Sequence, residues 1–266
     1  MAKSHFRTTE NSDPAFGFEG LKFITVKSKN LLGRGDICVF VPEGKHENLP
    51  VVTLLHGVYG SCWVWALKGN AHGVARDLIT SKKISPMILA MPSDGLWGDG
   101  SGYLPHGKQD FENWIAEDVQ QAVLENVPEV SAQSKHFICG LSMGGFGALK
   151  IGSRHHQKFC AISAHSSITS YNQMSLFVEE EERHYRSENP ELEDAFVSIL
   201  NNRDHLPPLR FDCGTEDLLL DYNRKLHLQL EQEDISHIYE EFSGGHQWNY
   251  WQDHLTDSLF FFNQFV

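Results

Sequence analysis

The stretch HFICGLSMGGFGAL, residues 136–149, combines a short apolar run, a serine between glycines and a segment with the length of a helix. The apolar run 136–141 is typical of a buried strand. A G-x-S-x-G motif between a strand and a helix lifts its serine onto a tight turn, where a base can reach the hydroxyl. The motif alone is weak because so short a pattern recurs by chance, but in this context it predicts that Ser142 is a nucleophile.

Apolar runs of strand length alternate with helix-length segments along most of the chain. This alternation predicts a mostly parallel sheet with helices on both faces, which is the α/β class. At the front, 21–28 and 36–41 are joined by a Gly-rich turn and are expected to form an antiparallel edge. The other expected strands are 51–55, 87–91, 136–141, 159–163, 209–213 and 236–242, and the expected helices are 71–81, 111–126, 144–154 and 218–233.

The composition is that of an ordinary globular protein, and we expect a single domain over 1–266. The chain has 35 acidic and 22 basic residues, and its net charge of −13 argues against nucleic acid or an anionic membrane as a partner. We find no signal-like N-terminus and no long apolar run, so we expect a cytoplasmic protein without a membrane partner. The five cysteines do not indicate a disulfide framework. The sequence also lacks the closely spaced ligand residues that would indicate a metal site, so we expect no metal.

The loops after the last two expected strands carry an acid pair and a histidine. Glu216 and Asp217 follow the first of these strands, and His246 follows the second. In folds built around such a serine turn, the acid and then the histidine lie at the carboxyl ends of later strands. A neutral imidazole can take the Ser142 proton and later return it. We therefore predict His246 as the base and one of the two adjacent carboxylates as its orienting acid.

The loop after the strand 51–55 reads HGVYG, residues 56–60. Acyl transfer needs two backbone amides that stabilise the negative oxygen of the intermediate. The residue after the nucleophile, Met143, supplies one, and we predict Val58 for the other, with Tyr59 as the second choice. Aromatic residues near these loops are candidates for substrate binding, although a buried tryptophan more often belongs to the core. The candidates are Tyr59, Trp63, Trp65 and Trp248.

Six segments together resemble the putative esterase family of α/β-hydrolases, which includes esterase D, feruloyl and acetylxylan esterases, tributyrin esterases and mycolyltransferase-type proteins. The resemblance implies an α/β-hydrolase fold and an acyl-enzyme mechanism on esters or thioesters, without metal or organic cofactor. Its catalytic positions fall on Ser142, Asp217 and His246, which favours Asp217 over Glu216. The segments are LLHGVYGSCWVW, MPSDGLWGDGSGY, FENWIAEDV, ICGLSMGGFGAL, FDCGTEDLLLDYNRKL and GGHQWNYW.

We therefore expect a serine carboxylesterase that acts on small, short-chain esters. S-formylglutathione hydrolase, feruloyl or acetylxylan esterase and acyltransferase are the alternatives, and a homo-oligomer is compatible with the sequence. A peptidase or a non-catalytic binding module is less consistent with this set of motifs.

The segment 166–206 is expected to form a cap over the site, where Tyr171, Met174 and Phe177 would meet the acyl chain. Within it, the acidic run 179–182 is expected to be a solvated helix face. Asp94 and Asp99 lie in a Gly-rich loop, and a cation there is a minor alternative.

Overall fold

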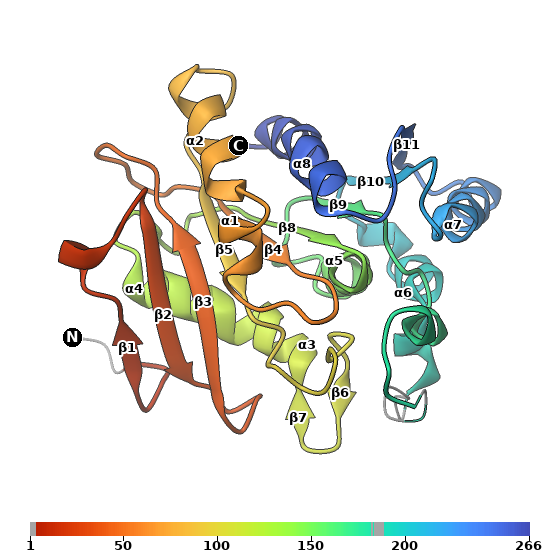
Figure 1. The fold of residues 1–266 in the computed structure, drawn as a ribbon, viewed down its shortest axis with the longest axis horizontal. Helices are drawn as coiled ribbons and strands as arrows, with labels where there is room; N and C mark the ends of the chain where they lie inside the picture. Colours follow the sequence, from red (N-terminus) through yellow and green to blue (C-terminus); the bar gives the residue numbers. More distant parts are fainter. Residues whose placement is uncertain (1–3, 182, 184–188) are drawn as a thin grey trace.

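A nine-stranded sheet organises the part of the chain described by this computed structural model, residues 4–181, 183 and 189–266. The strand order is β1-β2-β3-β5-β4-β8-β9-β10-β11 (Figure 1). Neighbours from β5 to β11 in this order pair in parallel, whereas β1, β2 and β3 form an antiparallel edge that meets β5. The strands are β1 (Thr9–Asn11), β2 (Leu21–Lys27), β3 (Arg34–Phe40), β4 (Val51–Leu55), β5 (Ile88–Pro92), β8 (His136–Leu141), β9 (Ile162–His165), β10 (Leu209–Gly214) and β11 (Ile238–Phe242), with a separate small hairpin of β6 (Pro105–His106) and β7 (Gln109–Asp110).

Helices cover both faces of the sheet, and each face has its own apolar core. The helices α1, α2 and α8 pack on one face, and α3 to α7 pack on the other. The helices are α1 (Val64–Leu67), α2 (Ala71–Thr80), α3 (Phe111–Asn113), α4 (Gln120–Asn126), α5 (Met143–Arg154), α6 (Ala195–Asn201), α7 (Leu220–Gln232) and α8 (Trp248–Asn263).

Strand β4 shows why the central strands are apolar at every position. Val51 and Leu55 belong to the core on one face, and Val52 and Leu54 belong to the core on the other. A strand that is covered on both sides has no position for a solvated side chain. Each such aliphatic side chain contributes about 1.5–3 kcal/mol when it is fully buried. The apolar runs in the sequence are therefore the buried strands at the centre of the sheet.

The α/β architecture and its antiparallel N-terminal edge are confirmed, with corrections to some boundaries. The strand expected at 159–163 is displaced, because β9 is Ile162–His165 and includes the polar residues Ser163 and His165. These two side chains are buried in a hydrogen-bonded network, which a search for apolar runs does not detect. The helix expected at 111–126 is present, but its middle, Trp114–Val119, is π-helical.

The C-terminal helix α8 was not predicted, although the sequence carries its signal. Trp251, Leu255, Leu259 and Phe262 are spaced by three or four residues and are all buried. This spacing places them on one face of a helix. The loop that carries His246 lies between β11 and this helix. The helix matters for the site because it follows that loop directly.

The segment 166–206 starts at the carboxyl end of β9, ends before the amino end of β10 and is mostly short helical turns. It includes 3-10 turns at Tyr171–Leu176, Pro190–Glu193 and Arg203–His205 in addition to α6. Residues 182 and 184–188 of this expected cap lie outside the described part, so the last position of the acidic run 179–182 is not placed. Within the described residues, no helix combines the length and apolarity that a bilayer span requires.

Candidate active site

Ser142 stands on a sharp turn between β8 and α5. Its φ is 54°, a left-handed value that costs energy in a residue other than glycine. The turn is fixed on both sides, because the Ser142 amide donates to the His165 carbonyl at 3.0 Å and the Ser142 carbonyl accepts from Phe146 at 3.2 Å. Space is the reason for the flanking glycine, since a Cβ on Gly144 would lie 2.3 Å from the carbonyl oxygen of Leu55. The strand, the turn and the helix therefore hold a strained serine that is only 3% exposed.

His246 connects Ser142 to Asp217 in an unbroken chain of hydrogen bonds. Its Nε2 lies 2.9 Å from Ser142 Oγ, and its Nδ1 lies 2.8 Å from Asp217 Oδ2. A carboxylate only accepts, so Nδ1 carries the proton and Nε2 accepts from the serine hydroxyl. The other carboxylate oxygen of Asp217 accepts from the Leu219 amide at 2.8 Å. Three loops that are far apart in the sequence thus place a hydroxyl, an imidazole and a carboxylate in line.

Glu216 has a different set of partners from its neighbour Asp217. Its carboxylate accepts from the Thr215 hydroxyl at 2.7 Å and from the amide of Gly244. Gly244 lies two residues before His246, with a φ of 132° that glycine adopts without strain. Glu216 therefore fixes the loop that carries His246, and Asp217 bonds the imidazole itself.

The two residues predicted to supply the oxyanion amides, Val58 on the loop after β4 and Met143 at the start of α5, meet beside Gly100. A Cβ on Gly100 would lie 2.6 Å from Met143 Sδ and 3.4 Å from a methyl carbon of Val58. Within the described residues, no acceptor is recorded for the Val58 amide. The Tyr59 amide donates to the Asp99 carbonyl at 2.8 Å, so the second choice for this role is already occupied.

The His56 side chain joins the loop after β4 to the loop that contains Asp94. Its Nε2 accepts from the Asp94 amide at 3.0 Å, so the proton is on Nδ1, which donates to the Gly57 carbonyl at 2.7 Å. The buried Asp94 carboxylate accepts in turn from the amides of Leu96 and Ser101 at 2.9 and 2.6 Å. The Asp94 carboxylate therefore holds the loop 94–101 in place through backbone amides. Among the described residues, no three acidic, histidine or cysteine side chains are grouped so that they could hold a metal ion.

Aromatic rings surround the His246 imidazole. Phe177 stacks on it with centroids 4.8 Å apart, and Trp251 meets it edge to face at 5.0 Å. Of the two residues expected to meet substrate beside Phe177, Met174 is 1% exposed and Tyr171 is 7% exposed, so both pack into the core. Of these three residues, Phe177 is therefore the one that contacts the His246 ring.

The four predicted substrate-binding aromatics differ in their exposure. Trp65 is 1% exposed and donates to the Leu55 carbonyl at 3.0 Å, so its expected binding role is wrong and it is a core residue. Trp248 packs edge to face on Trp65 at 5.7 Å and is half-buried. Trp63 and Tyr59 are exposed on the loop and helix that follow β4.

A second serine, histidine and aspartate set lies in the core, and the sequence analysis missed it. His165 Nδ1 bonds Asp212 at 2.8 Å, and His165 Nε2 bonds Ser258 Oγ at 2.8 Å. Burial alone would lower the pKa of His165, but the Asp212 carboxylate raises it to about 10. All three residues are 0% exposed, so no substrate can reach them. Arg210 and Tyr250 also bond Asp212, and the set ties β9, β10 and α8 together beneath the site.

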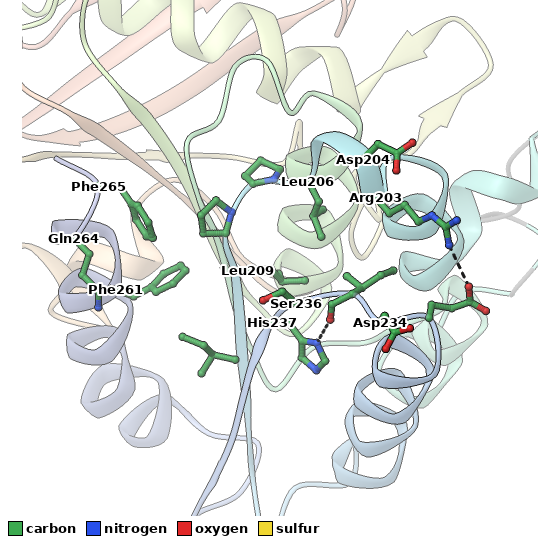
Figure 2. Close-up of a pocket in the computed structure, with 15 residues that line it drawn as sticks. Arg203, Asp204, Leu206, Leu209, Asp234, Ser236, His237, Phe261, Gln264 and Phe265 are labelled. Carbon is green, nitrogen blue, oxygen red and sulfur yellow. Dashed lines mark hydrogen bonds and ion pairs between the residues drawn. The ribbon is translucent and has the colours of Figure 1, made fainter.

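A groove of about 680 Å³ opens at the amino ends of β10 and β11, whereas Asp217 and His246 follow the carboxyl ends of these strands (Figure 2). It is lined by the Arg203–Leu206 turn, by residues 233–238 and by the end of α8 at Phe261 and Phe265. None of the predicted site residues lines it. The predicted chemistry therefore belongs to the carboxyl edge of the sheet, where β4, β8, β10 and β11 end.

The fold is that of an α/β-hydrolase, and its serine turn and histidine loop are arranged as in serine hydrolases of that fold. The family model described as putative esterase matches residues 28–262, and the chain belongs to this family. A relative from Caldicellulosiruptor saccharolyticus named acetyl esterase is 27% identical over 238 residues, which cover 83% of this chain and 85% of the relative. The chain is accordingly a carboxylic ester hydrolase of the serine esterase class.

Solved structures agree on the fold. A ferulic acid esterase is similar with a TM-score of 0.80 at 24% identity, covering 98% of this chain and 100% of that one. An S-formylglutathione hydrolase from Staphylococcus aureus is similar with a TM-score of 0.74 at 18% identity, covering 91% of this chain and 97% of that one.

Proposed function

We propose that the protein hydrolyses short-chain carboxylic esters through an acyl-enzyme on Ser142, with His246 as the base and Asp217 as the orienting carboxylate. The observation that carries the proposal is the continuous hydrogen bonding from Ser142 Oγ through both nitrogens of His246 to Asp217. A serine hydroxyl is a weak nucleophile by itself, and hydrogen bonding to an oriented imidazole supplies the base that activates it.

The first half of the reaction forms the acyl-enzyme. Ser142 Oγ attacks the ester carbonyl while its proton passes to His246 Nε2, and Asp217 stabilises the imidazolium that results. The amides of Val58 and Met143 stabilise the negative oxygen of the tetrahedral intermediate. The bond to the leaving alcohol then breaks, and His246 returns the proton to the alcohol oxygen. Water enters by the same steps and releases the carboxylic acid and Ser142.

Two observations support a short acyl group. Phe177 stacks on the imidazole and so limits the space above Ser142 and His246. The curated relative that matches most of this chain is named for an acetyl ester. The structural neighbours named for ferulic acid and S-formylglutathione supply the alternative substrates, and transfer of the acyl group to another alcohol is the alternative fate of the intermediate.

We further propose that 1–266 is a single catalytic domain and that 166–206 is its cap. The bridge between Ser170 and Asp194 and the contact of Phe177 with His246 support this role for the described part of the segment. Cytoplasmic location and self-association stay predictions, which cell fractionation and light scattering would test.

An ester panel tests the proposed function. The panel contains p-nitrophenyl acetate, butyrate and octanoate, methyl ferulate and S-formylglutathione, each assayed with and without an added alcohol. We expect kcat/KM to be highest for the short p-nitrophenyl esters, with the acid as the main product. Ser142→Ala should lose on the order of 10³ or more in kcat. Retention of most of the activity in that variant would refute the nucleophile assignment.

A further inference from the structure

The loop that contains Asp99 is bonded directly to the cap. The Asp99 carboxylate accepts from the amide of Glu179 at 2.9 Å and from that of Glu180 at 3.4 Å. In return, the Glu180 carboxylate accepts from the Asp99 amide at 3.2 Å. These hydrogen bonds require glycine at position 98, since a Cβ there would lie 2.5 Å from Glu180 Oε2. Glu179 and Glu180, the first residues of the run expected to be a solvated helix face, therefore form a bend that is fixed to another loop.

Tyr59 joins the same contact from the side of the oxyanion loop. Its hydroxyl lies 3.1 Å from the Phe177 carbonyl and 3.3 Å from the Asp99 carboxylate, and these two acceptors share its one proton. Its amide donates to the Asp99 carbonyl, so Asp99 holds the residue at both ends. Tyr59 has a φ of 58°, a conformation that the surroundings must maintain in a residue with a side chain. We call Tyr59, Asp99 and Glu180 the clasp.

The clasp lies between two groups that the reaction uses. Tyr59 directly follows Val58, whose amide is predicted to stabilise the oxyanion, and Phe177 covers the His246 ring. The clasp brings two carboxylates near each other, which costs repulsion. Hydrogen bonds from backbone amides to carboxylates are among the stronger ones in proteins and offset this cost. The arrangement fixes the relative position of the cap and the oxyanion loop.

We propose that Asp99 and Tyr59 are positioning residues for ester hydrolysis, which clasp the cap so that Phe177 stays on His246 and the Val58 amide stays aimed at the oxyanion. This inference rests on the proposed function. Neither side chain has to touch the reacting atoms. Loss of the clasp would release Phe177 and the Val58 loop together, and displacements of about 1 Å near a reacting group can cost about a hundredfold in rate.

A double-mutant cycle tests the clasp. Asp99→Ala, Phe177→Ala and the double variant are assayed for kcat and KM with p-nitrophenyl butyrate. We expect each single variant to lose about tenfold in kcat, with KM changed less than about threefold. Because Asp99 acts partly through Phe177, the double variant should lose clearly less than the product of the two single losses. Asp99→Asn, which keeps one oxygen acceptor, should recover most of the loss.

Two further variants keep the test decisive if Asp99→Ala disturbs folding. Tyr59→Phe removes only an exposed hydroxyl and should lower kcat about threefold to tenfold, by loss of one hydrogen-bonded contact at the clasp. Tyr239→Phe is the matched control, because it removes a tyrosine bond to a carboxylate, Glu241, outside the site, and it should leave kcat unchanged. Wild-type kcat in both Tyr59→Phe and Asp99→Ala, or losses that simply multiply in the double variant, would overturn the proposal.

Labelling by a fluorophosphonate separates this inference from the proposed function. If the wild type is labelled on Ser142 and the clasp variants react as fast as it does, only the clasp proposal fails. If Ser142 is not labelled in the wild type, the proposed function fails, whatever the clasp variants do. Slower labelling of Tyr59→Phe and Asp99→Ala, with Tyr239→Phe unchanged, is the result expected from the clasp.

Discussion

Asp217→Asn and Glu216→Gln are paired substitutions that distinguish two adjacent carboxylates. In Asp217→Asn, the side-chain oxygen keeps the hydrogen bond from the Leu219 amide, so the new amide nitrogen faces His246. An amide nitrogen cannot accept the Nδ1 proton, and the imidazole must move this proton to Nε2. His246 then no longer accepts from Ser142. Substitutions of this kind in serine hydrolases cost about 10⁴ in kcat, or about 5.4 kcal/mol of transition-state free energy.

Glu216→Gln should behave differently, although it makes the same chemical change one residue earlier. The glutamine oxygen can still accept from the Gly244 amide, which is the contact that fixes the histidine loop. We therefore expect a loss of less than about threefold, comparable to that of an exposed hydrogen bond. The assay is kcat for p-nitrophenyl acetate, with circular dichroism to show that both variants are folded. A large loss in Glu216→Gln together with near wild-type kcat in Asp217→Asn would show that Glu216, and not Asp217, orients His246.

Three further predictions concern the scaffold. Cys160 is the one exposed cysteine of the five, so native protein should react with about one equivalent of a disulfide reagent, and fast reaction of several thiols would contradict the burial of the others. Gly144→Ala should lower the free energy of unfolding by about 3 kcal/mol, because its Cβ would lie 2.3 Å from the backbone oxygen of Leu55; wild-type stability in urea would show that the turn can widen. The pKa of His165 is raised by Asp212 to about 10, against about 6.5 in an unfolded chain, so the stability that comes from protonated His165 is present below about pH 6.5, as long as Asp212 is ionised, and is lost as pH rises toward 10. Titration of the His165 ring near pH 6.5 by NMR would contradict this.

The sequence was sufficient to predict the sheet, its antiparallel edge and the loops that carry the site. Buried parallel strands appear in a sequence as continuous apolar runs. A glycine such as Gly144 indicates a place where the backbone comes close to another element, here β4. The order of serine, acid and histidine then limited the choice of partners. Their position in the chain made Glu216 and Asp217 the two candidates for the acid that orients His246. The family resemblance favoured Asp217.

Contacts between loops could not be predicted in this way. No periodicity in the sequence indicates that Asp99 accepts from Glu179, or that Tyr59 reaches the carbonyl of Phe177. Such bonds depend on where the ends of separate segments meet in space. The buried pair of His165 and Asp212 was missed for a related reason, because polar residues in a strand signal burial only when their partners are known.

Rapid quenching can detect whether Ser142 becomes acylated during turnover. The protein is mixed with p-nitrophenyl acetate, quenched in acid within the first turnover, digested and examined by mass spectrometry. If Ser142 is the nucleophile, we expect one acetyl group on the peptide that contains Ser142, a burst of nitrophenol of about one equivalent when release of the acid is slow, and neither signal in Ser142→Ala. An acetyl group on another residue during turnover, or unchanged hydrolysis by Ser142→Ala, would contradict it.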